Sequence, residues 1–292
     1  MLGRHLDLML LRLISHDRNI KTEEQIDAEA QELASNMSYV ATDEDFLKFT
    51  QRAGEHFEWK GRKILDVACG KGDLANQLAM KGASAVYGLD IQTPSINLAR
   101  ASAAKQGISN VEFFASDFHN WVTTEKFDYV VSYEALDHIP DAKATLRKMA
   151  SLVKDDGKII NFAAGFWRAP VGADHCHDFM RFSIPWTQLL FNEEALFTVR
   201  REKFRPNDPA TSFREIRGGL SMYTFSQYRE AIRDAGLEIV AWDVNYQLRY
   251  KLGGVLRPVS VVLSRTPLLG EYFIFSVMSV LSKQNQPALT DG

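Results

Sequence analysis

The amino-acid sequence predicts an α/β fold built on a doubly wound, seven-stranded and mostly parallel sheet, with helices at the N-terminus and an insertion after the fifth strand. Three observations support this prediction. Short apolar runs alternate with helical periodicity between residues 63 and 164, which is typical of repeated strand–helix units around a parallel sheet. A turn of small residues follows the first apolar run, and the alternation stops at residue 165.

The apolar runs and the turn residues between them locate the individual elements. Strands are predicted at residues 63–68, 85–91, 111–116, 127–133 and 158–163, and helices at 73–81, 94–106 and 142–153. Pro94 suits the first turn of a helix, and Gly82 and Gly107 suit helix ends. A helix at 224–235 and strands at 237–244 and 272–281 are predicted to complete the fold.

The chain is expected to divide into five parts. Residues 1–57 form an N-terminal helical segment, 58–164 the core, 165–222 the insertion, 223–284 the closing helix and strands, and 285–292 a disordered tail. The first 14 residues are rich in Leu and Met, but charged residues interrupt them and no cleavage site follows. They are also too few to span a bilayer. We expect a docking helix there, with an interfacial membrane anchor as the alternative.

Composition narrows the class of protein. Hydrophobic residues make up 46% of the chain and charged residues 24%, the balance of a soluble globular protein. The net charge of -3 provides no basic surface field, so nucleic acid is not an expected partner. Two cysteines, Cys69 and Cys176, are too few for a disulfide framework and suit a reducing compartment. We therefore predict a cytoplasmic protein.

The turn after the first strand, together with the ends of the next two strands, carries the most informative residues. The first strand ends at Ala68, and a turn from Cys69 to Gly72 leads into a helix, which lets the backbone approach a ligand closely. Asp90 ends the second strand, where a carboxylate can accept hydrogen bonds from ribose hydroxyls. Asp117 ends the third strand, where a carboxylate could accept a hydrogen bond from an adenine amino group.

These residues resemble the glycine-rich first motif and the acidic positions of class I S-adenosylmethionine-dependent methyltransferases, a family with a Rossmann-like fold. Residues 127–133 resemble the family's fourth motif, and 146–149 and 154–158 resemble the helix and turn before the fifth strand. The resemblance implies S-adenosylmethionine as the cofactor and an antiparallel last strand. It implies a cofactor site made of Asp66, Ala68, Cys69, Gly70, Gly72, Asp90, Ile91, Ser116, Asp117, Phe118 and Tyr133. Ala68 replaces the motif's first glycine, which argues against a left-handed backbone there.

A nicotinamide dinucleotide fold is the nearest alternative, because residues 70–75 also satisfy G-x-G-x-x-A. A pyrophosphate would lie at the start of the following helix, beside the carboxylate of Asp73. S-adenosylmethionine has no phosphate, and its ammonium and sulfonium tolerate carboxylates such as Asp66 and Asp73. Asp117 has no obvious task with a dinucleotide. The negative charges of these carboxylates therefore favour S-adenosylmethionine over a dinucleotide.

The loop after the fourth strand, residues 133–140, resembles a loop of small-molecule methyltransferases that presents a histidine toward the transferred methyl group. A neutral imidazole can take the proton of an acceptor hydroxyl, so His138 is the predicted general base. Capping of the next helix, or packing, is the alternative. We expect His119 to lie beside the adenine.

The insertion holds a second cluster of polar residues, Asp174-His175-Cys176-His177-Asp178. Its crowding matches no metal-ligand spacing, so no metal is predicted. His175 and His177 are candidate catalytic residues on the acceptor side, and a solvated or packing role is the alternative. The apolar residues at 184–186 and 189–191 could line an organic pocket or form a second small core.

The predicted activity is methyl transfer to a hydroxyl or carboxylate of a small organic, sugar or lipid-linked acceptor. A carbon or nitrogen methyltransferase, which would not need His138 as a base, is one alternative. A non-catalytic S-adenosylmethionine-binding subunit is another. A small-molecule or lipid-linked acceptor is the expected partner, no transmembrane segment is expected, and peripheral membrane contact stays open.

Overall fold

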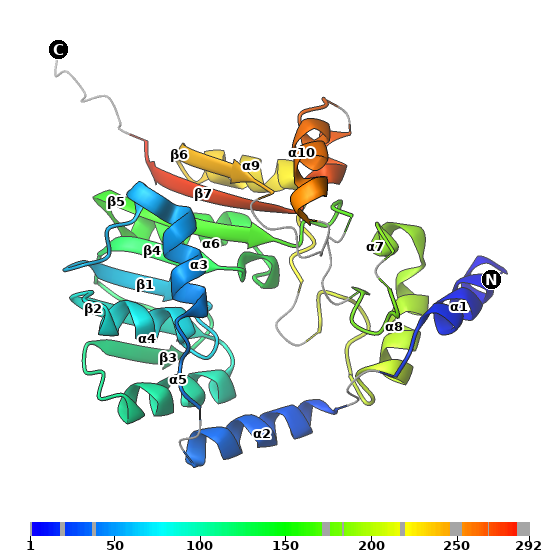
Figure 1. The fold of residues 1–292 in the computed structure, drawn as a ribbon, viewed down its shortest axis with the longest axis horizontal. Helices are drawn as coiled ribbons and strands as arrows, with labels where there is room; N and C mark the ends of the chain where they lie inside the picture. The colour runs from blue at the N-terminus through cyan, green and yellow to red at the C-terminus, as the bar shows by residue number, and fades with distance from the viewer. Residues whose placement is uncertain are drawn as a thin grey trace.

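A seven-stranded sheet with the order β3-β2-β1-β4-β5-β7-β6 forms the centre of the protein (Figure 1). The computed structural model describes residues 2–17, 21–36, 39–170, 176–182, 184–216, 220–245, 253–267 and 269–284. The predicted tail at 285–292 lies outside these residues. The strands are β1 (Lys63–Val67), β2 (Ala85–Asp90), β3 (Val111–Ala115), β4 (Phe127–Tyr133), β5 (Val153–Ala164), β6 (Leu237–Val244) and β7 (Ser276–Lys283).

The direction of the strands confirms the predicted fold class. Strands β1 to β5 pair in parallel, whereas β7 runs antiparallel between β5 and β6. The strand order turns back between β1 and β4, so the connections leave the sheet on opposite sides there. Crevices at such a point, outside the carboxyl ends of the strands, are where open α/β sheets bind ligands.

Two strands begin at least four residues away from their predicted starts, and a helix after β6 was not predicted. β5 begins at Val153 rather than residue 158, because an irregularity in its pairing with β4 carries the strand through the apparent turn at Gly157. The last strand begins at Ser276 because Gly270–Phe273 forms a 3-10 helix, η4. Helix α10 (Gly253–Ser264) was not predicted, since Pro258 and the nearby glycines resemble a loop.

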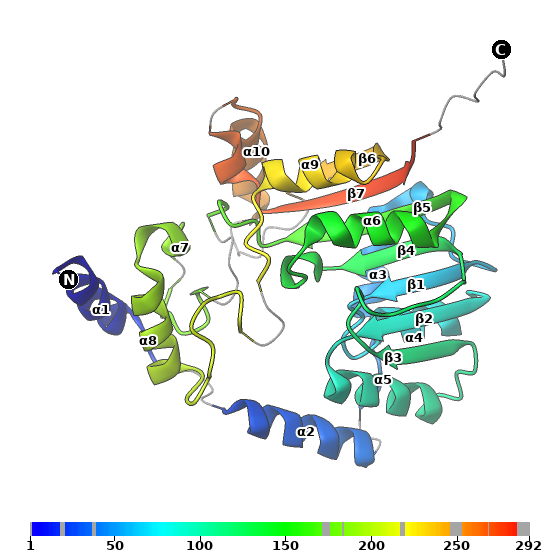
Figure 2. The same ribbon diagram turned by 180° about the vertical axis from the view of Figure 1, so that it is seen from behind.

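Helices cover both faces of the sheet. α3 (Glu44–Ala53), α4 (Asp73–Met80) and α5 (Thr93–Lys105) pack on one face (Figure 1). α6 (Ala142–Leu152) and α9 (Phe225–Asp234) pack on the other (Figure 2). Side-chain caps define two of these helix starts: Asp141 accepts from the Ala144 N–H, and Thr224 forms a reciprocal capping box with Gln227.

Most of the insertion packs with the N-terminal helix, whereas Phe166 and Ala169 at its start are buried in the core beside the sheet. α1 (Leu2–Ile14) lies beside α8 (Glu193–Lys203), near α7 (Thr187–Leu190) and away from the strands (Figures 1 and 2). Leu11 of α1 is buried in one apolar cluster with Phe179, Phe197 and Phe213 of the insertion. The insertion therefore has a small core of its own. α2 (Glu23–Ser35) runs from this unit to α5 (Figure 2).

The α1 segment thus serves as a docking helix, although Leu6, Met9 and Leu13 on its other side are exposed. In the part of the chain that the structure describes, no helix has both the length and the apolar character needed to cross a bilayer.

Candidate active site

A cavity of about 530 Å³ opens at the carboxyl ends of β1, β2, β3 and β4, where the strand order turns back. Its wall contains most of the residues predicted to bind the cofactor, together with the predicted base: Asp66, Ala68, Cys69, Gly70, Asp90, Ile91, Ser116, Asp117, Phe118, Tyr133 and His138. These residues come from distant parts of the chain, and the parallel sheet brings them to one edge.

The polar residues of the wall follow the order of the strands. Asp117 follows β3, Asp90 ends β2, Asp66 lies in β1 and Tyr133 ends β4, and these strands are consecutive neighbours. Since neighbouring strands lie about 4.8 Å apart, the row suits an elongated ligand with separate polar groups. Adenine, ribose and an amino-acid chain in that sequence would match it.

The glycine loop is braced by Asp90. One carboxylate oxygen of Asp90 accepts from the Gly70 N–H at 2.9 Å, and the other accepts from the Gln92 N–H at 2.8 Å. Gly70 has a φ of 53°, and a Cβ placed on it would meet nothing within 4 Å, so the backbone borders open space. A carboxylate has about four acceptor positions, so Asp90 keeps capacity for hydroxyl donors of a ligand.

Gly72 is the one predicted cofactor residue that the cavity wall does not include. It caps α4 with a φ of 75°, and a Cβ there would lie 2.7 Å from the Ala99 Cβ and 2.8 Å from the Phe113 ring. Its small size therefore allows α4 to start close against α5 and β3. Packing behind the loop therefore accounts for this glycine, and its contact with the cofactor stays a prediction.

Ala68 adopts the left-handed backbone that the sequence argued against, with a φ of 57°. The chain must turn away sharply at the end of β1, where the Cys69 N–H donates to the Leu89 carbonyl at 2.9 Å. Glu134, just after neighbouring β4, has a φ of 52°. A left-handed non-glycine residue costs about 1–2 kcal/mol, and such strain concentrates at functional sites. Both residues line the cavity.

Ala68→Gly should therefore stabilise the protein, by up to about 1 kcal/mol after the extra chain entropy of glycine is subtracted. Thermal unfolding would show this as a midpoint raised by about 2–4 °C. The matched control is Ala115→Gly at the end of β3, which is not left-handed and should lose stability. A lower midpoint for Ala68→Gly would mean that the Ala68 methyl contributes more by contact than its backbone costs.

Asp66 is a buried carboxyl group at the cavity wall. Its side chain is 2% exposed, and Oδ2 has no hydrogen-bond partner among the described residues. Burial, with the nearby carboxylates of Asp90 and Asp45, raises the pKa of Asp66 well above its usual range. A buried, unsatisfied carboxyl oxygen is costly unless a ligand pairs with it. The residues therefore fit a cationic ligand such as S-adenosylmethionine, and they disfavour a pyrophosphate.

The pKa of Asp66 makes the stability of the ligand-free protein dependent on pH. A carboxyl whose pKa is higher in the folded state than in the unfolded state stabilises folding at low pH, and this contribution is lost as pH rises. Asp66→Asn should therefore raise the unfolding midpoint at pH 8, by about 2 °C or more, with a smaller gain at pH 5. An equal or lower midpoint at pH 8 would contradict this prediction, and exposed Asp43→Asn serves as the control.

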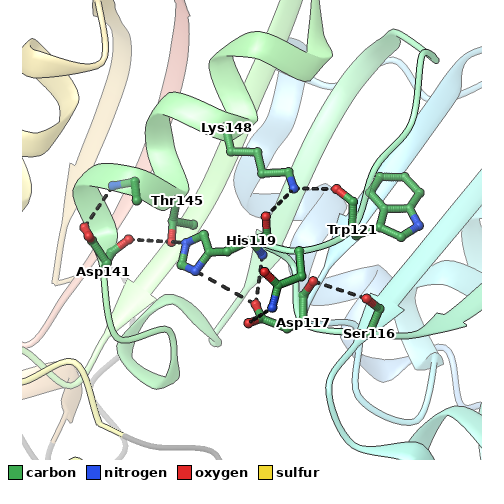
Figure 3. Close-up of polar contacts among 9 residues, drawn as sticks. Ser116, Asp117, His119, Trp121, Asp141, Thr145 and Lys148 are labelled. Atoms are coloured by element: carbon green, nitrogen blue, oxygen red, sulfur yellow. Dashed lines mark hydrogen bonds and ion pairs between the residues drawn. The ribbon is translucent and has the colours of Figure 1, made fainter.

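The loop after β3 is held against α6 (Figure 3). Asp117 accepts from the His119 N–H at 2.8 Å and from the Asn120 side chain at 3.0 Å. The Lys148 ammonium donates to the His119 carbonyl at 3.0 Å and lies 5.2 Å from the centre of the Phe118 ring. These contacts fix the position of the Phe118 ring in the cavity wall.

The His119 imidazole, which was expected beside the adenine, contacts α6. Its Nε2 lies 3.0 Å from the Thr145 Oγ1, on α6 (Figure 3), and His119 is not part of the cavity wall. The backbone turn at Asp117 directs the ring toward the helix. His119 thus links this loop to the helix that follows the acceptor-side loop.

The β4 end of the cavity is formed by Tyr133, Glu134, Ala135 and His138, which is the last residue of a 3-10 turn, η2 (Leu136–His138). The His138 side chain is 31% exposed, and its Nε2 lies 3.8 Å from Oδ2 of nearly buried Asp137. Burial raises the pKa of Tyr133 to about 12, so its phenol stays protonated and can donate a hydrogen bond.

The insertion supports this loop from outside the cavity. The Ser221 N–H donates to the Asp137 carbonyl at 2.6 Å, and the Tyr223 hydroxyl donates to the Pro140 carbonyl at 3.1 Å. The cavity wall contains no described residue of the insertion. Of the apolar residues considered for a pocket, Phe191 packs against the insertion's core, Trp186 contacts the Phe273 ring at 5.9 Å between ring centres, and Leu189 and Leu190 are exposed.

One of the two candidate histidines of the insertion, His177, is not part of the cavity wall. His177 is 8% exposed, between the buried residues Cys176 and Phe179. His175 lies outside the described residues. Neither the described part of the insertion nor any other described segment holds a group of three potential metal ligands.

Several residues of the wall were not predicted. They are Asp45, Val67, Lys71, Asp73, Leu74, Leu89, Gln92, Glu134, Ala135, Ile139 and Pro140. Most of them are next to a predicted site residue in the sequence, so including the neighbours of each motif residue would have identified them. Asp45 is different, because it lies in α3, before the first strand, and no motif points to it.

Comparisons with known proteins agree with this geometry. Residues 58–164 match a family described as a methyltransferase domain. A ubiquinone biosynthesis O-methyltransferase of Neisseria meningitidis serogroup C is 36% identical over 106 residues, 36% of this chain and 44% of that protein. The alignment thus spans less than half of that relative. The enzyme of the same name from Aeromonas salmonicida is 30% identical over 52% of this chain and 68% of its own length.

A solved structure shows the same fold. An S-adenosylmethionine-dependent methyltransferase from Clostridium acetobutylicum superposes with a TM-score of 0.53 at 14% identity, covering 88% of this chain and 97% of the other.

Proposed function

Since the chain belongs to the class I S-adenosylmethionine-dependent methyltransferases, we propose that it methylates a hydroxyl group of a small organic or lipid-linked acceptor, with His138 as the general base. The observation that carries the proposal is the position of His138. It lies in the wall of the same cavity as Asp66, Asp90 and Asp117, at the end of the polar row beside β4. Relatives named O-methyltransferases support oxygen as the acceptor atom.

The cofactor would be held along the row of strand ends. Asp117 and Phe118 would contact the adenine, Asp90 the ribose, and Asp66 with the loop at Gly70 the methionine part. When bound, S-adenosylmethionine supplies an electrophilic methyl group on its sulfonium. The strained turn at Ala68 brings the loop backbone close to the place that this part of the cofactor would take.

His138 would act on the acceptor. An acceptor hydroxyl is a better nucleophile as its proton leaves, and a neutral imidazole can receive that proton. Asp137, 3.8 Å from the His138 Nε2, would stabilise the imidazolium that results. The Tyr133 phenol, protonated because burial raises its pKa to about 12, can donate a hydrogen bond to the acceptor. Ile139 and Pro140 add apolar surface to this side.

The test is product analysis. The purified protein is incubated with S-adenosylmethionine and with hydroxyl-bearing organic compounds or lipid extracts, and S-adenosylhomocysteine is measured. The methylated atom is then identified by mass spectrometry and NMR. A methoxy product supports the proposal. A methyl group on carbon or nitrogen would assign the chain to another type of methyltransferase and leave His138 without its role.

A further inference from the structure

We propose that Asp45, on α3, joins Asp66 in binding the ammonium group of S-adenosylmethionine, so that the N-terminal segment completes the cofactor site. The inference rests on the assignment of the cavity to this cofactor. It adds a residue outside the glycine loop and the strand ends, from a part of the chain that precedes the methyltransferase domain match at residues 58–164.

Packing of α3 on the sheet places Asp45 at the cavity. Phe49, one turn further along α3, contacts the Tyr133 ring at 5.8 Å and the Phe162 ring at 4.8 Å, measured between ring centres. The start of the helix therefore lies at the carboxyl ends of β1 and β4. Asp45 is in the first turn and lines the cavity. It is not the capping residue, since Asp43 holds that position.

Asp45 has no partner in the described protein. It forms no hydrogen bond or ion pair with any described residue, although Asp73 and two lysines lie near enough to affect its charge. Lys48 pairs with Glu44 at 2.5 Å, and the Lys71 ammonium lies 4.9 Å from the centre of the Tyr39 ring. Neither lysine forms an ion pair with Asp45.

The other carboxylates of the cavity differ in this respect. Asp73 accepts from the Tyr39 hydroxyl at 2.5 Å and from the Thr42 N–H at 2.9 Å, which ties the segment before α3 to α4. Asp90 accepts one hydrogen bond from the Gly70 N–H, in the glycine loop, and one from the Gln92 N–H. Asp45 and the buried Oδ2 of Asp66 remain as acceptors without a donor among the described residues.

The chemistry of these two groups selects an ammonium. An ammonium has three N–H donors, so it can bond to both carboxylates at once, whereas a sulfonium has none. Burial raises the pKa of both Asp45 and Asp66, which means that two negative charges are costly there without a cation. A ligand ammonium would remove that cost and give the free amino acid end of the cofactor a specific position.

The experiment compares two thioether ligands that differ by the amino-acid group. S-adenosylhomocysteine has this group with its ammonium, and 5′-methylthioadenosine keeps the adenosine without it. In calorimetry, Asp45→Asn should weaken S-adenosylhomocysteine binding by about tenfold or more and change 5′-methylthioadenosine binding by less than about twofold. Asp43→Asn, which removes a nearby exposed carboxylate, should change neither. Asp45→Ala repeats the test, and thermal unfolding confirms that each variant is folded.

Three outcomes would overturn the inference. Equal effects of Asp45→Asn on both ligands would mean that Asp45 acts through the fold. Tighter binding of S-adenosylhomocysteine would place Asp45 beside the carboxylate of the amino-acid group instead of the ammonium. Unchanged binding of both would leave Asp45 outside the site. Failure of the unmodified protein to bind either ligand would be a different result, because it would contradict the cofactor assignment itself.

Discussion

Replacing His138 with alanine should lower turnover by ~10²–10⁴, the usual contribution of a positioned general base. Affinity for S-adenosylmethionine should change by less than about twofold, because His138 lies at the β4 end of the cavity, away from Asp90 and Asp117. Initial rates under saturating cofactor, with affinity from calorimetry, measure both quantities. The result would separate a role toward the acceptor from a role in holding the cofactor.

The pH dependence gives a second measure of the same residue. The rate of the unmodified protein should fall as pH is lowered, because a protonated imidazole cannot accept a proton, and His138→Ala should lose this fall. His5→Ala, at an exposed position of α1, is the matched control and should behave like the unmodified protein. Near-normal turnover of His138→Ala would reject the base role. Joint loss of cofactor binding and stability would make His138 a packing residue.

The second large effect is expected at Asp90. Asp90→Ala should weaken S-adenosylmethionine binding by about 1.5–3 kcal/mol, the range for hydrogen bonds to a charged group. The carboxylate would accept the ribose hydroxyls, and it also holds the Gly70 N–H at 2.9 Å. Because every ligand with the same ribose would lose these bonds, 5′-methylthioadenosine should weaken by a similar factor. This separates Asp90 from Asp45, whose effect should require the ammonium.

Calorimetry with both ligands tests this prediction, and Asp90→Asn serves as the shape-matched variant. The Asn side chain has one carbonyl oxygen as acceptor, so the affinity of Asp90→Asn for both ligands should lie between that of the unmodified protein and that of Asp90→Ala. If Asp90→Ala kept its affinity for both ligands, Asp90 would only brace the glycine loop. Thermal unfolding of the variant, measured without ligand, shows how much that brace contributes to the stability of the fold.

The sequence determined the sheet and most of one edge of the site through local signals. The spacing of apolar runs predicted the parallel strands, and the residues at their ends followed because parallel strands place their carboxyl ends together. Asp66, Asp90 and Asp117 could be found in this way without any long-range information. Turn and cap residues such as Pro94 and Asp141 determine the conformation of residues next to them in the sequence, so they too can be recognised from the sequence.

The tertiary structure alone decided features that depend on contacts between distant residues. Gly72 resembles a ligand-binding glycine, yet its neighbours are Ala99 and Phe113, which only packing brings within reach. Ala68 takes a left-handed backbone because the hydrogen bond from the Cys69 N–H to the Leu89 carbonyl requires the turn. Asp45 reaches the cavity because Phe49 packs α3 on the sheet. Each of these features depends on a contact between residues that are distant in the sequence. Such a contact produces no local pattern or periodicity from which it could be predicted.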